Sequence, residues 1–289
     1  MAFDSSPTLV KQFATKITKH LGDLENMIIQ TLGDTGYQAS FSAEQFVTET
    51  EYWEKYYECP DITYEWNDGY LEEKLVSDYL TFLSYEWFWK LLEYYLTTKP
   101  IAKIVGLEMG FRLDLSDKNV VRRPDLGIVL NTNKVPLLPI DKSYKGTFDL
   151  CIEAVSDSKR ADIKRDIEDK PKEYAQNGVG EYYIIDGHNR YSGFYCLGTD
   201  GVYHSIPTQK DIIKSTILPG FQFRFKDLYS RPPHDIMIKD EVYKDFVLPE
   251  YSEALEKLEI ETLARKEAEQ QVIRLAKQLR NLGVEPLDK

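Results

Sequence analysis

The chain has 289 residues, which is long enough to bury a sizeable core as one globular domain with helical attachments. Apolar residues make up 42% of the sequence and aromatic residues 13%, which argues against a disordered chain. The net charge of −12 argues against tight nonspecific binding to DNA, because phosphate-binding proteins usually present a basic face. No apolar run is long enough to span a bilayer and no leader pattern follows Met1, so we expect a soluble, cytoplasmic protein.

The composition also gives little support to a zinc site or a histidine-based catalytic triad. Three cysteines are widely spaced without a C-x-x-C pair, and four histidines are scattered along the chain. Cys151 falls in an apolar segment and is predicted to be a small buried hydrophobe. The sequence has no glycine-rich phosphate loop, which argues against an enzyme that hydrolyses nucleoside triphosphates.

The first predicted element is an amphipathic helix within residues 1–44, because apolar residues recur there at three- and four-residue intervals. This N-terminal extension could pack on the domain or on a partner, and the pattern leaves both open. Thr48 and Glu51 then form a plausible capping box for a short aromatic helix through Tyr57. A β-hairpin follows at residues 62–75, with its turn at Asn67-Asp68-Gly69.

The next predicted element is a long helix that begins with Ser77 as its N-cap and ends near Thr98, before Pro100. It is rich in aromatic residues, which more often pack in a core than stack on nucleic-acid bases. The aromatic residues in question are Trp87, Phe88, Trp89, Tyr94 and Tyr95.

Four strands, a second helix and a fifth strand are predicted next. The fourth strand, at residues 147–155, is mostly apolar, as is typical of a strand in the middle of a sheet. The strands are expected at residues 103–107, 111–115, 125–130 and 147–155, the helix at 161–177, and a further strand at 182–185. Asn177-Gly178 supplies the C-terminal stop of the second helix. Pro171 lies inside it and predicts a kink or a late helix start near Lys170.

The chain is predicted to end with antiparallel edge strands beyond Gly187 and a helix at about residues 250–282. Apolar residues keep a heptad spacing from Ala268 to Leu282, which supports docking, dimerisation or a short coiled coil. We therefore expect an α/β (α+β) core at residues 45–247, with a central mixed β-sheet flanked by helices. The N-terminal extension at 1–44 and a C-terminal helix at 248–289 would flank this core.

Three residues carry the predicted chemistry. Asp125 lies at the head of one apolar strand, Glu153 lies inside the next, and Lys170 lies on the helix that follows. Two carboxylates can hold a hard divalent cation, and a nearby ammonium can orient the attacking water in phosphodiester hydrolysis. Glu153 taken alone would favour a carboxylate on a solvated strand face, but its combination with the Pro124-Asp125 step and Lys170 favours a site.

From about Gln45 to Pro286 the chain resembles the Uma2 family of restriction endonucleases, common in cyanobacteria and assigned to the PD-(D/E)xK nuclease superfamily. The resemblance rests on the order and spacing of several short motifs. These are Tyr64-Glu65 before Asp68-Gly69, Pro124-Asp125-Leu126, Glu153-Ala154-Val155-Ser156, Arg165-Asp166 before Lys170, Tyr174-Ala175, Gly178-Val179, Glu181-Tyr182, Ile185-Asp186, Leu218-Pro219-Gly220-Phe221, Leu275-Ala276, Leu279-Arg280, Leu282-Gly283 and Pro286.

The resemblance implies a restriction-endonuclease-like core in which Asp125 and Glu153 bind Mg²⁺, with Mn²⁺ as a possible substitute. The usual lysine position, two residues after Glu153, is Val155, so the family pattern offers Lys170 from the following helix instead. Glu65 would bind a second cation or support the first, although a solvated strand-end carboxylate explains it as well. By the same resemblance, the products would carry a 5′-phosphate and a 3′-hydroxyl.

Candidate substrate-binding residues make the predicted site locally basic within an acidic protein. Arg123 lies beside Asp125, while Lys159 and Arg160 follow Glu153 closely. Tyr174 lies one turn after Lys170 and could bind a phosphate or the attacking water, although a packed tyrosine is the commoner case.

The leading hypothesis is a magnesium-dependent endonuclease that hydrolyses phosphodiester bonds in DNA and forms a homodimer through its C-terminal helix. The first alternative is a catalytically inactive nuclease-fold protein that acts as an interaction or assembly module, because a fold can outlive its chemistry. The second alternative is a hydrolase that acts on a small phosphate ester. A cleft wide enough for a duplex would favour the nuclease, and a closed pocket would favour the small substrate.

Overall fold

The computed structural model describes residues 46–75, 77–155 and 160–281. The predicted N-terminal helix within residues 1–44 and the candidate Lys159 lie outside these ranges. Two short elements begin the described chain, a helical turn α2 (Glu49–Glu51) and a π-helical turn η1 (Tyr52–Tyr56). The Thr48 side chain accepts a hydrogen bond from the Glu51 backbone N–H at 3.2 Å, which confirms Thr48 as the cap.

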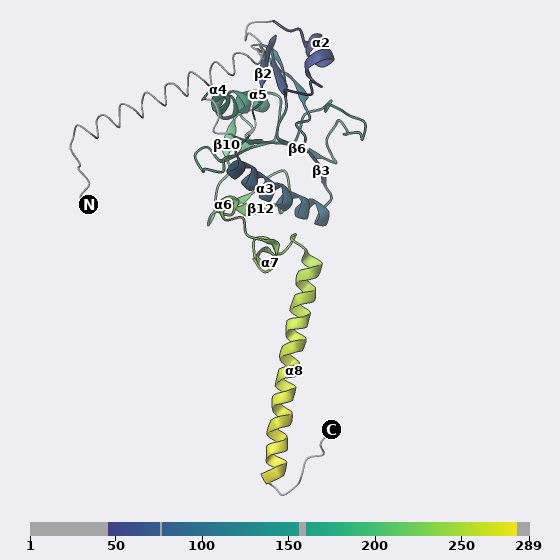
Figure 1. The fold of residues 1–289 in the computed structure, drawn as a ribbon, viewed down its shortest axis with the longest axis vertical. Helices are drawn as coiled ribbons and strands as arrows, with labels where there is room; N and C mark the ends of the chain where they lie inside the picture. Colours follow the sequence, from purple (N-terminus) through teal and green to yellow (C-terminus); the bar gives the residue numbers. More distant parts are fainter. Residues whose placement is uncertain (1–45, 76, 156–159, 282–289) are drawn as a thin grey trace, which may run out of the picture. The chain divides into compact units, whose positions relative to one another are not determined.

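A six-stranded mixed sheet forms the centre of the core, as predicted (Figure 1). Its strands, in spatial order, are β10 (Tyr203–Ser205), β9 (Gly193–Leu197), β8 (Glu181–Ile185), β7 (Leu150–Ala154), β6 (Leu126–Leu130) and β3 (Ala102–Val105). Only the pair β7 and β8 is parallel within this sheet, and helices connect the two. The crossover brings the predicted lysine-bearing helix back onto the sheet.

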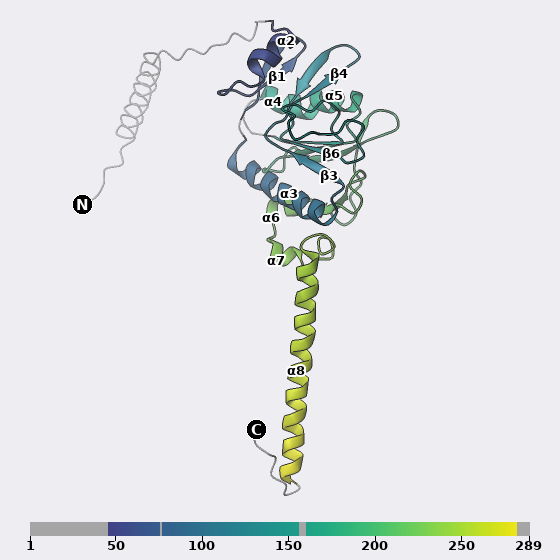
Figure 2. The same ribbon diagram turned by 90° about the vertical axis from the view of Figure 1, so that its right-hand side faces the viewer.

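Alternating side chains of the central strands bury both faces of this sheet. Leu150 and Ile152 of β7 pack in one hydrophobic cluster with α3, whereas Cys151 packs in a second cluster with Tyr174. Glu153 therefore shares the face of Cys151, which α5 covers. Figure 2 shows α3 on one side of the sheet and α4 and α5 on the other.

The long aromatic helix is α3 (Tyr79–Thr98), and it ends before Pro100 as predicted. Its N-cap is Asp78, not Ser77, because the Asp78 carboxylate accepts hydrogen bonds from the backbone N–H groups of Leu80 and Thr81. The Ser77 hydroxyl instead donates to the backbone carbonyl of Ala154 at 2.8 Å. This bond ties the start of α3 to the end of β7, beside Glu153.

A second, four-stranded antiparallel sheet carries Glu65. Its order is β2 (Tyr70–Glu73), β1 (Tyr64–Asn67), β5 (Asn119–Arg122) and β4 (Phe111–Asp114). The predicted hairpin is confirmed as β1 and β2, with Asp68 and Gly69 at positive φ in the turn. Strand β5 was not predicted, although it leads directly into the Pro124-Asp125 step.

The predicted second helix consists of three segments, α4 (Arg160–Lys164), a π-helical turn η2 (Arg165–Asp169) and α5 (Lys170–Gln176). Pro171 has no N–H to donate, and the widened π turn immediately before it accommodates this loss, which confirms the predicted interruption. The stop at Asn177-Gly178 is also confirmed, since Gly178 adopts a φ of +81°.

The remaining elements follow the core sheet. They are β11 (Ile212–Lys214), β12 (Gln222–Arg224), α6 (Asp227–Ser230), α7 (His234–Met237) and α8 (Pro249–Asn281). Helix α8 exposes many apolar side chains, including Leu258, Leu263 and Val272. Among the helices in the described ranges, none is both long and apolar enough to cross a membrane.

Candidate active site

Asp125 and Glu153 lie on either side of one ammonium group. Lys74 Nζ lies 2.8 Å from Asp125 Oδ1 and 3.5 Å from Glu153 Oε2. Strands β6 and β7 pair with Leu126 opposite Ile152, so the next position of this antiparallel register places Asp125 opposite Glu153. Asp125 Oδ2 also accepts a hydrogen bond from the backbone N–H of Ala154 at 2.6 Å. The strand register thus explains why these two carboxylates meet.

Lys170 enters the same cluster from α5. Its Nζ lies 3.0 Å from Glu153 Oε1, 3.3 Å from Glu65 Oε1 and 2.9 Å from Asp166 Oδ1, and the side chain is only 1% exposed. One turn later, the Tyr174 hydroxyl donates to Glu153 Oε1 at 2.9 Å. One oxygen of Glu153 therefore contacts Lys170 and Tyr174, while the other faces Lys74.

Glu65 belongs to a buried network of ion pairs centred on Arg122. The fully buried Arg122 guanidinium donates to Glu65 at 3.1 Å and to Glu173 at 2.6 and 2.9 Å, and it also pairs with Glu72. The other oxygen of Glu65 accepts from the backbone N–H of Arg123 at 2.8 Å. The charge of Arg122 is thus neutralised inside the protein, so Arg122 adds nothing to a basic surface.

Burial and neighbouring charges shift the pKa values of these groups in opposite directions. Burial raises the pKa of Asp125 and of Glu153, and the nearby lysines offset only part of this effect. Burial also opposes ionisation of Glu65, but the charges of Lys170, Arg122, Lys74 and Arg165 outweigh it and hold the pKa of Glu65 well below its usual range. Glu65 is therefore a fixed anion of the fold.

The two lysines remain charged. Burial disfavours the ammonium of Lys170, but Asp166, Glu153 and Glu65 hold its pKa well above the usual value. Asp125 and Glu153 raise the pKa of Lys74 in the same way, against the effect of burial. Both side chains are therefore ammonium ions near neutral pH.

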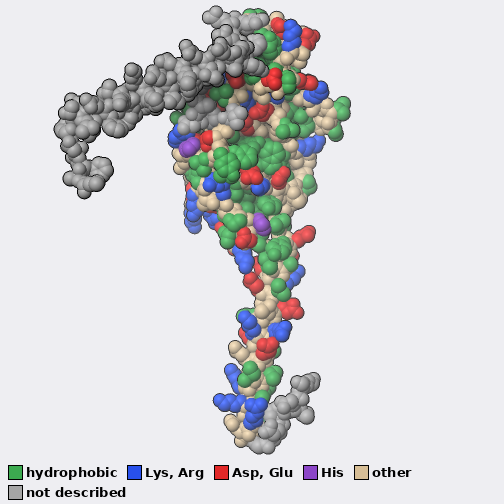
Figure 3. Space-filling view, viewed as in Figure 1, with side chains coloured by type: hydrophobic (Ala, Val, Ile, Leu, Met, Phe, Trp, Pro, Cys, Tyr) green, Lys and Arg blue, Asp and Glu red, His purple; other side chains and the backbone are tan. Residues whose placement is uncertain are grey.

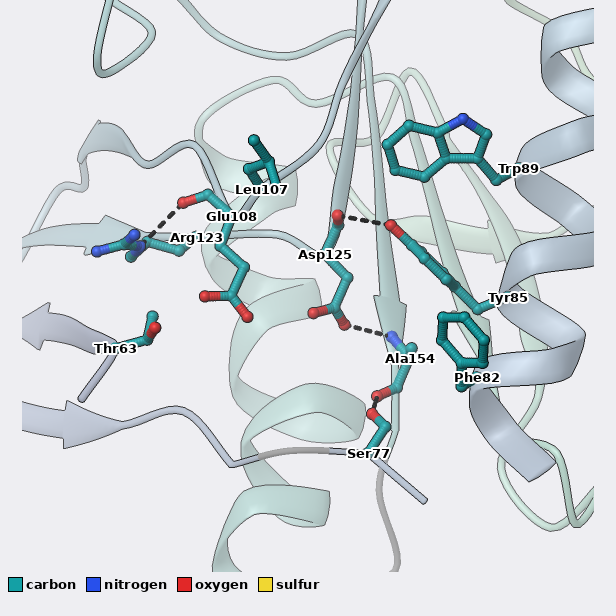
Figure 4. Close-up of a pocket in the computed structure, with 10 residues that line it drawn as sticks. All are labelled: Thr63, Ser77, Phe82, Tyr85, Trp89, Leu107, Glu108, Arg123, Asp125 and Ala154. Carbon is teal, nitrogen blue, oxygen red and sulfur yellow. Dashed lines mark hydrogen bonds between the residues drawn. The ribbon is translucent and has the colours of Figure 1, made fainter. Parts of the chain in front are cut away.

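Asp125 also lines a pocket of about 560 Å³. Figure 4 shows its carboxylate pointing into the space between three aromatic side chains of α3 and the turn that follows β3. The lining residues are Thr63, Ser77, Phe82, Tyr85, Trp89, Leu107, Glu108, Arg123, Asp125 and Ala154. The Asp125 side chain is 19% exposed and that of Glu153 only 1%, so a substrate would approach the cluster from the Asp125 side.

The predicted substrate-binding residues have different environments. Arg123 lines the pocket, but its guanidinium donates to the backbone carbonyls of Glu108 and Tyr57 and lies 4.6 Å from the centre of the Tyr57 ring. Arg160 is exposed on α4. Tyr174 was predicted as a substrate-binding residue, with a packed tyrosine as the commoner case. It is fully buried and its hydroxyl donates to Glu153, so the structure agrees with the packed case.

The donor set at this site suits a magnesium ion. Asp125 and Glu153 supply hard oxygen ligands, and the ammonium of Lys74 shows that their arrangement attracts a cation. Within the ranges 46–75, 77–155 and 160–281, no group of three His, Cys, Asp or Glu side chains is arranged to hold a metal ion. Mg²⁺ commonly binds through one or two carboxylates and completes its shell with waters and substrate phosphate, so two carboxylates are sufficient.

A family model named Uma2 and described as "Putative restriction endonuclease" matches residues 51–226. The chain belongs to this family. The match includes Glu65, Lys74, Asp125, Glu153 and Lys170, and it ends before α8. Membership supports the expected restriction-endonuclease-like core and a nuclease as the general type of protein.

Solved structures similar to this Uma2 protein include one described as a putative nuclease belonging to DUF820 from Anabaena variabilis, which is 14% identical in sequence. The match covers 64% of this chain and 98% of that one, with a TM-score of 0.49. No curated protein matches the chain.

Lys74 is the site residue of this Uma2 protein that the sequence analysis missed. It follows β2 directly, and the β1 strand paired with β2 carries Glu65. A lysine after a short strand is commonly a solvated residue, and no spacing rule links it to Asp125, which lies fifty-one positions later. The one available signal was that Lys74 shares a hairpin with a candidate acidic residue.

Proposed function

We propose that this Uma2 protein is a metal-dependent endonuclease that hydrolyses phosphodiester bonds in DNA. The observation that supports this proposal best is the meeting of Asp125 and Glu153 with two ammonium groups beside a pocket. Paired carboxylates can hold the cation in magnesium-dependent phosphodiester hydrolysis, and nearby ammonium groups can offset the developing charge. Family membership supports the same type of activity.

Asp125 and Glu153 would hold Mg²⁺, with Mn²⁺ as a substitute. When bound, the cation would polarise the scissile phosphate and offset its developing charge. Lys74 then has to move away from between the carboxylates, because an ammonium and a divalent cation repel each other at that distance. Its long side chain would keep the ammonium near Asp125, where it can contact the phosphate or orient the attacking water.

Lys170 has a more indirect role in this proposal than the sequence suggested. All three of its charged partners are carboxylates, and its side chain is 1% exposed. Its ammonium would hold Glu153 in place and raise the positive potential around the attacking water without contacting DNA. We therefore keep Lys170 as an aid to the reaction and assign the contact with water or phosphate to Lys74.

The test is a cleavage assay on DNA with Mg²⁺ or Mn²⁺. We expect Asp125→Asn and Glu153→Gln to lower the rate at least about 100-fold, since even residues that only support metal ligands can cost that much. The matched control is Glu86→Gln, which removes an exposed carboxylate paired with Lys90 on α3. A protein that binds neither metal, or an Asp125→Asn variant that cuts like the wild type, would refute the proposal.

We also propose that the enzyme is a homodimer that pairs through α8. Val272, Leu275 and Leu279 lie at heptad spacing on this helix, and their exposed fractions are 65%, 50% and 39%. A second copy of the same stripe would cover them, as in a two-stranded coiled coil. Analytical ultracentrifugation of the full chain tests this, and a monomer at every concentration would contradict it.

A further inference from the structure

The pocket beside Asp125 has an aromatic wall that the proposed chemistry does not use. Phe82, Tyr85 and Trp89 occur at intervals of three and four residues, so one face of α3 presents all three rings to the pocket. Figure 4 shows these rings on the side of the pocket opposite Leu107 and Glu108. Figure 3 shows hydrophobic side chains gathered at the surface along α3. Phe82 is 46% exposed, which is unusual for a ring that serves only a core.

The opposite wall is a turn with an unusual backbone. Leu107 and Glu108 adopt positive φ angles of 56° and 52°, a conformation that costs energy for residues with a Cβ. The Leu107 side chain is 97% exposed at the pocket and packs against almost nothing. A Cβ at Gly106 would lie 2.3 Å from the Trp89 ring, so only glycine lets this turn approach the aromatic wall. The fold therefore fixes an exposed leucine across from three rings.

We propose that this pocket binds one unstacked nucleobase, and that the substrate is a single-stranded nucleic acid or the unpaired part of a longer one. This inference rests on the proposed nuclease function and names its substrate class. A volume of about 560 Å³ lies in the usual range for small-ligand pockets, about 300–1,000 Å³. A flat, neutral base can stack on Phe82 and Tyr85, whereas a phosphate would meet the carboxylates of Asp125 and Glu108.

The charge of the protein favours the same class of substrate. Duplex-binding proteins gain most of their affinity from phosphate contacts, and this chain carries a net charge of −12. The buried cations of the site are also paired with carboxylates, as Arg122 and Lys170 show. Stacking on aromatic rings supplies affinity without such contacts and tolerates any base sequence. We therefore expect binding that depends only weakly on salt concentration.

The decisive experiment compares three fluorescein-labelled probes by anisotropy with the full chain in EDTA. The probes are hexathymidylate, a hexamer of abasic deoxyribose phosphates, and a blunt twelve-base-pair duplex. We expect hexathymidylate to bind at least about tenfold more tightly than the other two, because only it offers bases that can stack. Equal affinity for the abasic probe or for the duplex would overturn the proposal. Hexauridylate serves as a fourth probe and shows whether the protein prefers ribose or deoxyribose. Tight binding of either hexanucleotide supports a single-stranded nucleic acid as the substrate class.

Two variants and a control locate the binding site. Phe82→Ala should weaken hexathymidylate binding about tenfold, within the range for loss of one stacking ring. Leu107→Gly removes the opposite side chain but suits the positive φ, so it keeps the fold intact and should also weaken binding several-fold. Tyr251→Ala is the matched control, since it removes a ring that is 54% exposed on α8 and does not line the pocket. Unchanged binding in both pocket variants would overturn the proposal.

The same variants separate this inference from the proposed function. If the wild type cuts intact duplexes with Mg²⁺ and Phe82→Ala cuts them equally well, the nuclease function stands and the base pocket is wrong. If the binding pattern appears as expected but no probe is cut with Mg²⁺ or Mn²⁺, the base pocket stands and the nuclease function is wrong.

Discussion

Replacing Lys74 with methionine tests whether this ammonium holds the place of a metal ion. The change removes the cation that lies 2.8 Å from Asp125 and 3.5 Å from Glu153, and it keeps most of the side-chain volume. Asp125 would then lose its ion-pair partner beside a second carboxylate, whereas Glu153 would keep Lys170. We expect the metal-free variant to be less stable than the wild type.

The magnitude follows from the burial of the pair. Removing one partner of a fully buried ion pair costs about 3–5 kcal/mol. The side chains of Lys74 and Asp125 are 9% and 19% exposed, so solvent screens part of the loss and we expect about 2–3 kcal/mol. For a domain of this size, each kcal/mol shifts the melting temperature by about 2–4 °C. The metal-free variant should therefore melt about 4–12 °C below the wild type.

The assay is thermal unfolding with and without Mn²⁺. At about one hundred times its dissociation constant, a ligand stabilises the folded state by about 2.7 kcal/mol. Mn²⁺ does not have to displace an ammonium in Lys74→Met, so it should raise the melting temperature of this variant more than that of the wild type. The matched control is Lys118→Met, which removes a lysine 2.8 Å from the buried Glu173. Glu173 keeps its contact with Arg122, so Mn²⁺ should not rescue this control.

An equal Mn²⁺ shift in Lys74→Met and in the wild type would refute the reasoning. It would mean that Lys74 and the metal do not compete for Asp125 and Glu153. A Lys118→Met variant rescued as strongly as Lys74→Met would refute it as well, because the rescue would then be unspecific.

Four further outcomes are expected. Arg122→Met removes the cation that Glu65 and Glu173 share inside the protein and should destabilise it by about 3–5 kcal/mol in urea unfolding, whereas a loss below about 1 kcal/mol would show that the network is dispensable. Tyr174→Phe removes the hydrogen bond to Glu153, and calorimetry should show weaker Mn²⁺ binding in a variant that still folds. Burial raises the pKa of Asp125 and of Glu153, so protons compete with the metal for these carboxylates as the pH falls. Mn²⁺ affinity should therefore begin to decline at a higher pH than it would for ordinary carboxylates, which stay ionised between pH 5 and 8. A Mn²⁺ affinity that is constant over this range would contradict the expectation. Val272→Lys places a charge in the α8 stripe and should convert a dimer to a monomer in ultracentrifugation, with an unchanged mass counting against pairing through this helix.

Much of the fold followed from local patterns in the sequence. The hairpin at Asn67-Asp68-Gly69, the long aromatic helix before Pro100 and the stop at Gly178 depend on turn and helix-end chemistry that neighbouring residues decide. The apolar run that became β7 was recognisable as a central strand because both of its faces are buried. Strand β5 is no shorter than the predicted β4, but it was missed because its two apolar residues, Val120 and Val121, are adjacent and show no alternation.

The candidate site was predicted only in part. Asp125 and Glu153 were recognised as a pair, and the register of β6 and β7 brings them together. Lys170 was placed on the correct helix, but its burial among three carboxylates depends on how α5 packs against the sheet. The sequence interpretation also treated Arg123 as a substrate-binding residue, whereas its guanidinium donates to the backbone carbonyls of Glu108 and Tyr57.

The sequence by itself determined which residues of this Uma2 protein could bind a metal and which elements carry them, because strand, turn and helix signals are local. Only the tertiary structure decided which charges neutralise one another. Lys74 pairs with Asp125 and Glu65 pairs with Arg122, in each case between segments far apart in sequence, and these pairings depend on distances that no local pattern encodes. The aromatic pocket has the same origin, since Phe82 and Leu107 face each other only after α3 packs beside the turn that follows β3.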